Sequence, residues 1–206
     1  MRRVTAARMT VLALAALAPQ MHGCGIFSPR DPRPGGGTAV VCLTANTPDD
    51  VVSNVLAQYA SFPGHECYSS MMDTSFTFHP DAADSIDAAT AGQGTVYANW
   101  TAGVESNVDL LLAREATFHV TVFDSMYATT VTSPGPPQSE LRFYAYHLVI
   151  HAPRVAPDDT LFQGHADITF TQRPNTQWAI TGWQDRRDGS GARTWGYLRR
   201  QYRVGF

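Results

Sequence analysis

The stretch Glu140-Leu-Arg-Phe-Tyr-Ala-Tyr-His-Leu-Val-Ile-His-Ala152 is the clearest structural signal in the sequence. It is rich in β-branched and aromatic residues at a period of two, which is typical of a long strand. Three further stretches share this composition and are separated by proline-containing linkers, at residues 116–130, 160–173 and 177–185. We therefore predict an antiparallel meander. Strands longer than the usual five or six residues favour a strongly twisted, bent sheet.

Helical signals precede these strands. Thr47-Pro-Asp-Asp50 combines a hydroxyl N-cap, a proline in the first turn and two acidic residues, so a helix is predicted from Thr47 to Phe62. Two shorter helices are predicted over residues 66–73 and 102–114, a short strand over residues 75–79, and a loop from Asp81 to Gln93. Helices that precede strands, rather than alternate with them, indicate an α+β fold. We expect three N-terminal helices to cover the concave face of a bent antiparallel sheet of four to six strands.

The N-terminus has the pattern of an export signal. Arg2, Arg3 and Arg8 precede an apolar run, Met9 to Ala18, that suits a signal-peptide core and is about half as long as a membrane-spanning helix. A cut after Ala18 would leave a proline next to the cleavage site, which disfavours that position. Residues 1–23 are therefore predicted to be a signal peptide.

The end of this signal resembles the lipobox of bacterial lipoproteins. The resemblance lies in Met21-His-Gly-Cys24 and the charged and apolar pattern before it. It implies that Cys24 is diacylated and becomes the new N-terminus, so that the chain is exported and fastened to the bacterial cell envelope. Gly25 in place of an aspartate implies the outer membrane in a two-membrane bacterium. A soluble exported protein and an uncleaved anchor are the alternatives.

The segment after Cys24 is rich in Pro and Gly and is predicted to be a tether at residues 24–45, ahead of a domain at residues 46–206. Loss of residues 1–23 would change the formal net charge from −3 to −6, because three Arg and no acidic residue leave with them. An acidic domain repels nucleic acid, so no nucleic-acid partner is expected.

Composition excludes several chemistries. All 15 basic residues are Arg, which excludes a phosphate-loop lysine and a Schiff-base lysine. Cys42 and Cys67 would remain in the exported chain, where a disulfide between them is expected and two buried free thiols are the alternative. Two cysteines and scattered histidines do not make a metal-ligand set, so neither a metal site nor a cofactor is expected.

Four segments together resemble the nuclear-transport-factor-two-like superfamily, which includes SnoaL-like and ketosteroid-isomerase-like cone domains. They are the helix at 47–62, the segment Tyr68 to Phe78, Trp100 with Glu105, and the segment Trp178 to Asp185. The resemblance covers about residues 46–203. It implies a pocket between helices and bent sheet that takes a small hydrophobic molecule or a protein partner, and a homodimer formed through the sheet.

Catalytic candidates come from the alternation of the strands. If the register permits, three neighbouring strands bring His119, His147 and Asp167 onto one surface. A buried histidine with a carboxylate is suited to proton abstraction next to a carbonyl. A solvent-exposed strand face without chemistry is the alternative. The resemblance also implies a tyrosine that holds an oxyanion, for which Tyr59 is the candidate, although no pair of acids matches the isomerase pattern.

Binding candidates are aromatic. Trp178, Trp183 and Tyr146 either contact a ligand or pack in the core. The only basic cluster, at residues 199, 200 and 203, is expected to form salt bridges, with contacts to lipid phosphates as the alternative.

Two functions from different classes follow. The first is a non-catalytic, lipid-anchored binding or accessory module of the cell envelope. The second is a small-molecule isomerase, cyclase or dehydratase of the same fold that uses a His/Asp acid-base pair.

Overall fold

The structure is a computed structural model that describes residues 41–60, 65–116, 118–126 and 130–203. Helices dominate the first half of this part of the chain and strands the second half. In chain order the elements are α1 (Pro48–Ala60), α2 (His65–Met71), β1 (Met72–His79), α3 (Ala82–Thr90), α4 (Ala102–Glu115), β2 (Phe118–Met126), β3 (Val131–Ser133), β4 (Ser139–His151), β5 (Leu161–Gln172), β6 (Trp178–Arg186) and α5 (Trp195–Arg203).

The six strands form one bent sheet in the order β1-β6-β5-β4-β2, and β3 pairs with the start of β4. Neighbouring long strands pair antiparallel, as predicted, but β1 pairs parallel with β6. The α+β class, the helices on the bent sheet and the strand number are confirmed, and the β1–β6 pairing is the one departure from the antiparallel arrangement among the described strands. A parallel pairing is possible because two helices and four strands lie between β1 and β6 in the chain, so no tight turn has to join the two strands.

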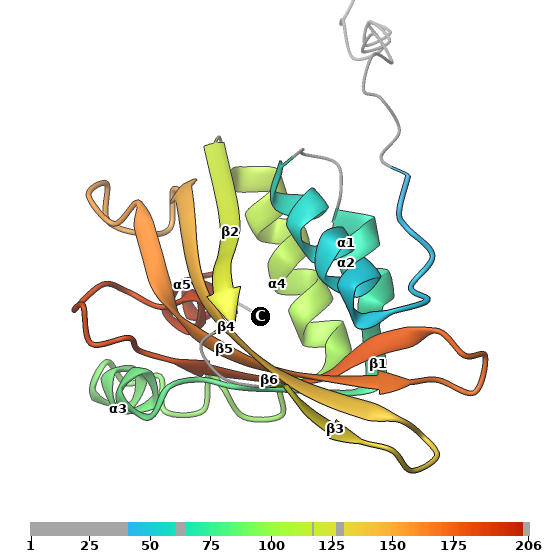
Figure 1. Cartoon of the computed structure of the whole chain (residues 1–206). Coiled ribbons are helices and arrows are strands. Elements are labelled where there is room, and N and C mark those ends of the chain that lie inside the picture. The colour runs from blue at the N-terminus through green and yellow to red at the C-terminus, as the bar shows by residue number, and fades with distance from the viewer. Residues whose placement is uncertain (1–40, 61–64, 117, 127–129, 204–206) are drawn as a thin grey trace, which may run out of the picture. The chain divides into compact units, whose positions relative to one another are not determined.

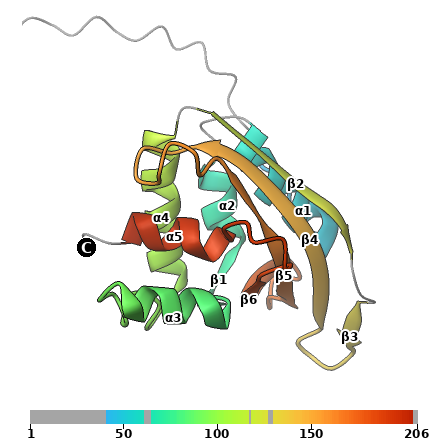
Figure 2. The same ribbon diagram turned by 90° about the vertical axis from the view of Figure 1, so that its left-hand side faces the viewer.

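One face of the sheet packs against the helices (Figure 1). Along β4 the buried side chains are Tyr144, Tyr146, Leu148 and Ile150, which alternate with partly exposed ones. We call this side the inner face. It meets Val51 and Val55 of α1, Val108 and Leu112 of α4, and Leu198 of α5 in one apolar cluster. Figure 2 shows α4 and α5 on the side towards which the strands curve.

Two irregularities in strand pairing coincide on β6. Between β1 and β6 the register passes from Met72↔Ile180 to Thr77↔Gly182, so β1 carries several extra residues. Between β5 and β6 it passes from Thr169↔Gly182 to Phe170↔Ile180, which leaves Thr181 as the extra residue on β6. Bulges bend a strand locally and disrupt the ladder. Both bulges therefore distort the sheet around Thr181.

Two helices were not predicted. Residues 82–90 lie in the predicted loop, but Asp81 caps them by accepting a hydrogen bond from the amide of Ala83 at 2.7 Å, and alanines favour the helix. The second is α5, in which Trp195, Leu198 and Tyr202 recur at helical spacing within a mostly polar sequence and share the buried face with Arg199 and Arg200.

The chain is fastened to the domain before the predicted start at residue 46. Cys42 and Cys67 are joined in a disulfide, with their Cα atoms 5.3 Å apart. The amide and carbonyl of Leu43 both bond to the side chain of Asn54, and the carbonyl of Ala45 accepts from the amide of Trp178 at 2.7 Å. Residues 42–45 therefore belong with the domain rather than with the predicted tether. Residues 1–40, with the predicted signal peptide and Cys24, lie outside the described residues.

Candidate functional site

A buried carboxylate holds the start of α5 against the inner face. Asp185 of β6 is fully buried and accepts hydrogen bonds from the Tyr146 hydroxyl at 2.8 Å and from the amide of Gly196. The Tyr146 oxygen in turn accepts from the amide of Trp195 at 2.7 Å. Burial is the largest influence and raises the pKa of Asp185 to about 7, although Arg199 and both donors act in the opposite direction.

A second buried group joins α4 to α5. Arg199 Nε lies 2.7 Å from Glu105 Oε1, and Glu105 also accepts from the Tyr68 hydroxyl at 2.6 Å and from Trp100 Nε1 at 2.7 Å. The Arg199 guanidinium lies within 5 Å of the ring centroids of Phe78, Trp183 and Trp195. These contacts join α4 to α5 through a buried ion pair and its hydrogen bonds, so their role is to hold the two helices together. Of the predicted basic cluster, Arg199 thus forms the expected salt bridge.

The predicted aromatic contacts also lie on this inner side. Trp183 is buried edge-to-face against Trp195, with ring centroids 4.7 Å apart, and Tyr146 and Trp178 are buried as well. The hydroxyl group of Tyr146 already bonds to Asp185 and to the amide of Trp195 in α5. The indole N–H of Trp183 has no hydrogen-bond acceptor among the described residues. Core packing, the alternative to ligand contact, describes these rings well.

The predicted acid-base set is not brought together. In the register of β4 and β5, His147 faces Gln163 and Asp167 faces Phe143, so His147 and Asp167 are separated by four positions along the sheet, roughly 13 Å. His147 instead pairs with Asp124 at 2.9 Å, and Asp167 pairs with Arg186 at 2.7 Å. A His147/Asp167 pair is therefore wrong, because the register separates residues that alternation alone places on one face.

The other two catalytic candidates fall on side chains that the structure does not describe. Tyr59 belongs to α1 and His119 to β2. The backbone register pairs His119 with Ile150, and it is Val122 that stands opposite His147.

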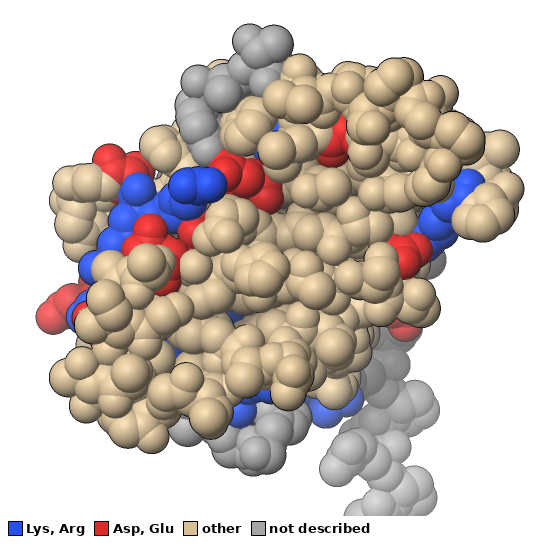
Figure 3. Space-filling model, turned by 90° about the horizontal axis from the view of Figure 1, so that it is seen from below, with Lys and Arg blue, Asp and Glu red and all other residues tan. Residues whose placement is uncertain are grey.

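The opposite, outer face of the sheet contains hollows lined by described residues. Three of these hollows have volumes of about 650, 400 and 300 Å³. Seen from below, the surface under the sheet is mostly uncharged, with Arg, Asp and Glu gathered towards its margins (Figure 3). A mostly uncharged, hollowed face is better suited to recognition than the inner polar groups, which already bond to one another.

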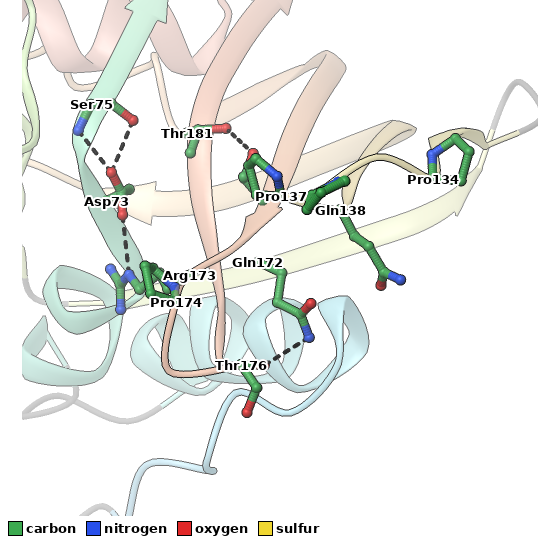
Figure 4. A pocket seen from close by; sticks show the side chains of 12 residues that line it. Asp73, Ser75, Pro134, Pro137, Gln138, Gln172, Arg173, Pro174, Thr176 and Thr181 are labelled. Atoms are coloured by element: carbon green, nitrogen blue, oxygen red, sulfur yellow. Dashed lines mark hydrogen bonds and ion pairs between the residues drawn. The ribbon is translucent and has the colours of Figure 1, made fainter.

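The 650 Å³ hollow, which we call the proline groove, lies where the two bulges meet. Its walls come from the β3–β4 and β5–β6 turns and its floor from the bulged strands (Figure 4). Asp73 of β1 is ion-paired with Arg173 beyond β5, with Oδ2 and Nε 3.1 Å apart. The lining residues are Asp73, Ser75, Pro134, Pro136, Pro137, Gln138, Thr171, Gln172, Arg173, Pro174, Thr176 and Thr181.

The 300 Å³ hollow contains the Asp124–His147 pair at its edge. Gln163 and His165 also line it, and Gln163 donates to Asp188 at 2.9 Å. A carboxylate on Nδ1 of a histidine fixes the tautomer that leaves Nε2 as a base. Among the described residues, no cluster of three or more His, Cys, Asp or Glu is arranged to hold a metal ion. No described helix is long and apolar enough to cross a bilayer.

Sequence reasoning missed the residues that matter most here. Asp185 ends the predicted strand at residues 177–185, but nothing in its neighbours shows that Tyr146 and the start of α5 enclose it. The proline groove did leave a trace, since one of its walls, Ser133-Pro-Gly-Pro-Pro137, is among the proline-containing linkers between the predicted strands.

Comparison with known proteins gives similarity at the level of fold only. No protein-family model matches the chain, and no curated protein matches it significantly. Similar solved structures include a protein of unknown function from Mycobacterium tuberculosis, with 9% identity, a TM-score of 0.45 and coverage of 68% of this chain and 69% of the other. ActVI-ORFA from Streptomyces coelicolor has 14% identity, a TM-score of 0.43 and coverage of 67% and 94%.

A nuclear transport factor 2 (NTF2-like) superfamily protein from Salmonella enterica also matches, with 10% identity, a TM-score of 0.38 and coverage of 69% of this chain and 91% of the other. The superfamily that the sequence pattern resembles is thus represented among these structures. At such identities and TM-scores, the similarities say nothing about activity.

Proposed function

We propose that this protein is a binding module of the bacterial cell envelope, held to a membrane by lipid on Cys24, that takes its ligand on the outer face of the sheet. The proline groove is the observation that carries the binding role, since a hollow of about 650 Å³ falls in the range of ligand sites. The inner polar groups favour this placement over the pocket between helices and sheet expected from sequence, because they are occupied in fastening α4 and α5.

The anchor is tested in a bacterial host with labelled palmitate. The full-length chain should incorporate label and sediment with membranes, and Cys24→Ala should do neither. Cys42→Ala is the matched control, because Cys42 lies in the disulfide and its loss should not prevent labelling. An unlabelled wild-type chain that keeps Met1 would refute the anchor without touching the binding role.

The binding role is tested by a small-molecule fragment screen monitored by NMR on the exported domain. Amide shifts should cluster at Thr171, Arg173 and Thr181 on the outer face. If fragments shift only groups around Trp183, the ligand lies on the inner side, and the proposed location is wrong.

A second candidate function, small-molecule acid-base catalysis, is favoured by the Asp124–His147 pair. The two groups are 2.9 Å apart at the edge of a hollow, which suits a general base. Both are partly exposed, so the pair is weaker evidence than a buried one. Any isomerase or dehydratase activity found should be lost in His147→Gln and kept in His151→Gln, and an equal loss in both variants would reject this site.

A further inference from the structure

The floor of the proline groove contains a chain of hydroxyl groups with a fixed direction. Thr181 Oγ1 donates to the carbonyl of Thr169 at 3.3 Å and lies 2.9 Å from Thr171 Oγ1. A carbonyl only accepts, and a hydroxyl has a single proton. Because the proton of Thr181 goes to Thr169, the proton in the bond between the two threonines must come from Thr171.

This direction decides what Thr171 can offer to a ligand. Its own proton is committed to Thr181, so its oxygen retains acceptor capacity alone, and Thr171 lines the groove. Figure 4 shows the bond from Thr181 on the floor beside Pro137. A ligand group that meets this end of the chain must therefore be an N–H or O–H donor.

The charges of the groove are already neutralised within the protein. Arg173 pairs with Asp73 and also donates to the carbonyl of Met72 at 2.6 Å. The other carboxylate oxygen of Asp73 accepts from the amide and the hydroxyl of Ser75, at 3.0 and 2.9 Å. An added ionic group would have to displace these partners, so the groove suits a ligand without net charge.

The walls select the rest of the ligand. Pro134, Pro136 and Pro137 come from one turn and Pro174 from the other, and their rings present C–H surface without any N–H donor. Proline rings are rigid and pack against aromatic faces, as they do when proline-rich segments dock on aromatic residues.

We propose that the proline groove binds an uncharged aromatic ring bearing one hydrogen-bond donor, a phenol or an indole, with the donor on Thr171 Oγ1 and the ring against the prolines. This inference rests on the proposed binding function and names its ligand class. The ring can belong to a free small molecule or to a Tyr or Trp side chain of a peptide, and the experiment separates these sources.

The test is an NMR titration of the exported domain with p-cresol, using 4-methylanisole, which has no donor, and 4-methylcyclohexanol, which has no aromatic ring, as matched ligands. We expect p-cresol to bind with a dissociation constant on the order of millimolar, as suits a fragment of this size, and both analogues to bind about three- to tenfold more weakly. The peptide Gly-Gly-Tyr-Gly-Gly, with blocked ends, is titrated in the same way. Tighter binding than that of p-cresol would indicate a peptide side chain as the source of the ring, and weaker binding a free small molecule.

Three variants assign the effect. Thr171→Val should weaken p-cresol about three- to tenfold, and Thr77→Val, on the outer face but outside the groove, should leave it unchanged. Thr181→Val releases the proton of Thr171, so the preference for p-cresol over 4-methylanisole should shrink. Circular dichroism and melting temperature check that each variant folds.

The outcomes separate the two proposals. Equal binding of p-cresol and 4-methylanisole in the groove, or no effect of Thr171→Val, overturns the ligand class while the binding function stands. The ligand class is likewise overturned, and the binding function stands, if other fragments bind in the groove but neither p-cresol nor the peptide does. If no fragment binds on the outer face, both proposals fail.

Discussion

Asp185 lies in surroundings that differ greatly from those of a carboxyl group in water. It is fully buried on β6, and burial raises its pKa from the ordinary value of 3.8 to about 7. Between these two pH values the folded chain keeps a proton on Asp185 that the unfolded chain has released. The free energy of unfolding should therefore fall as the pH rises through this window, with the contribution of Asp185 complete below about pH 4 and lost above about pH 7.

Asp185→Asn should remove this dependence, because an amide does not titrate. The free energy of unfolding of the wild type, measured relative to that of the variant, should fall by roughly 2–4 kcal/mol between pH 4 and pH 8. Urea denaturation at a series of pH values measures it. The contributions of other carboxylates cancel in this difference. Asp73 is one example, because hydrogen bonds from Ser75 lower its pKa in both proteins. A difference that is flat with pH would show that Asp185 ionises normally.

Gly196 is packed too closely for any side chain. A Cβ atom there would lie 2.9 Å from Asp185 Oδ2 and 3.3 Å from Phe78 Cζ. Gly196→Ala should destabilise the protein by about 1–3 kcal/mol, since neither the strand nor the packed ring gives way easily. Gly103→Ala is the control, because its nearest contact would be 3.9 Å away and an exposed helical alanine is neutral or slightly stabilising. Equal melting temperatures of the two variants would contradict the close packing around Gly196.

Among the elements, α5 depends on tertiary contacts for its position. Glu105→Gln keeps the shape of the side chain but leaves the Arg199 charge buried without its carboxylate. We expect a loss of about 3–5 kcal/mol in urea denaturation. The matched change Glu115→Gln affects a partly exposed pair with Arg154 and should cost at most about 1 kcal/mol. Equal losses would mean that the buried pair contributes no more than a surface one.

The disulfide fastens the segment before α1 to α2. Cys42 and Cys67 are 25 residues apart in sequence, and a closed loop of this size stabilises by about 3 kcal/mol through the unfolded chain. Reduction with dithiothreitol should lower the midpoint of urea denaturation of the wild type. It should leave the Cys42→Ala/Cys67→Ala double variant unchanged, and a midpoint that moves equally in both proteins would point to another cause.

Prediction of single elements succeeded where one local pattern decides. The start of α1 was placed within a residue by Thr47 and its acidic neighbours, and β4 and β5 were placed by alternation. It failed for α5, because an arginine is classed as exposed until a carboxylate such as Glu105 is brought to it by folding. It failed for the Asp167 pairing because alternation fixes a face but not a register.

At the scale of the whole molecule, the mostly uncharged outer face is suited to contact with a second copy of the chain, as the family resemblance implied. Phe143 and Leu141 of β4 are partly exposed on this face. We predict that the exported domain sediments as a dimer at micromolar concentration and that Phe143→Glu shifts it to a monomer. Ile86→Glu changes an exposed side chain of α3, away from this face, and should leave the dimer intact. A monomeric wild type would refute this arrangement.

By itself the sequence determined the class of fold, the order of helices before strands, the inner face of the long strands and the expectation of an export and lipidation signal. These depend on local periodicity, capping and short motifs. Only the tertiary structure decided which polar groups are buried, where the two bulges meet and which turns enclose the proline groove. The physical reason is that burial, register and hydroxyl direction arise from contacts between residues far apart in the chain, such as Asp185 with Tyr146 and Thr171 with Thr181.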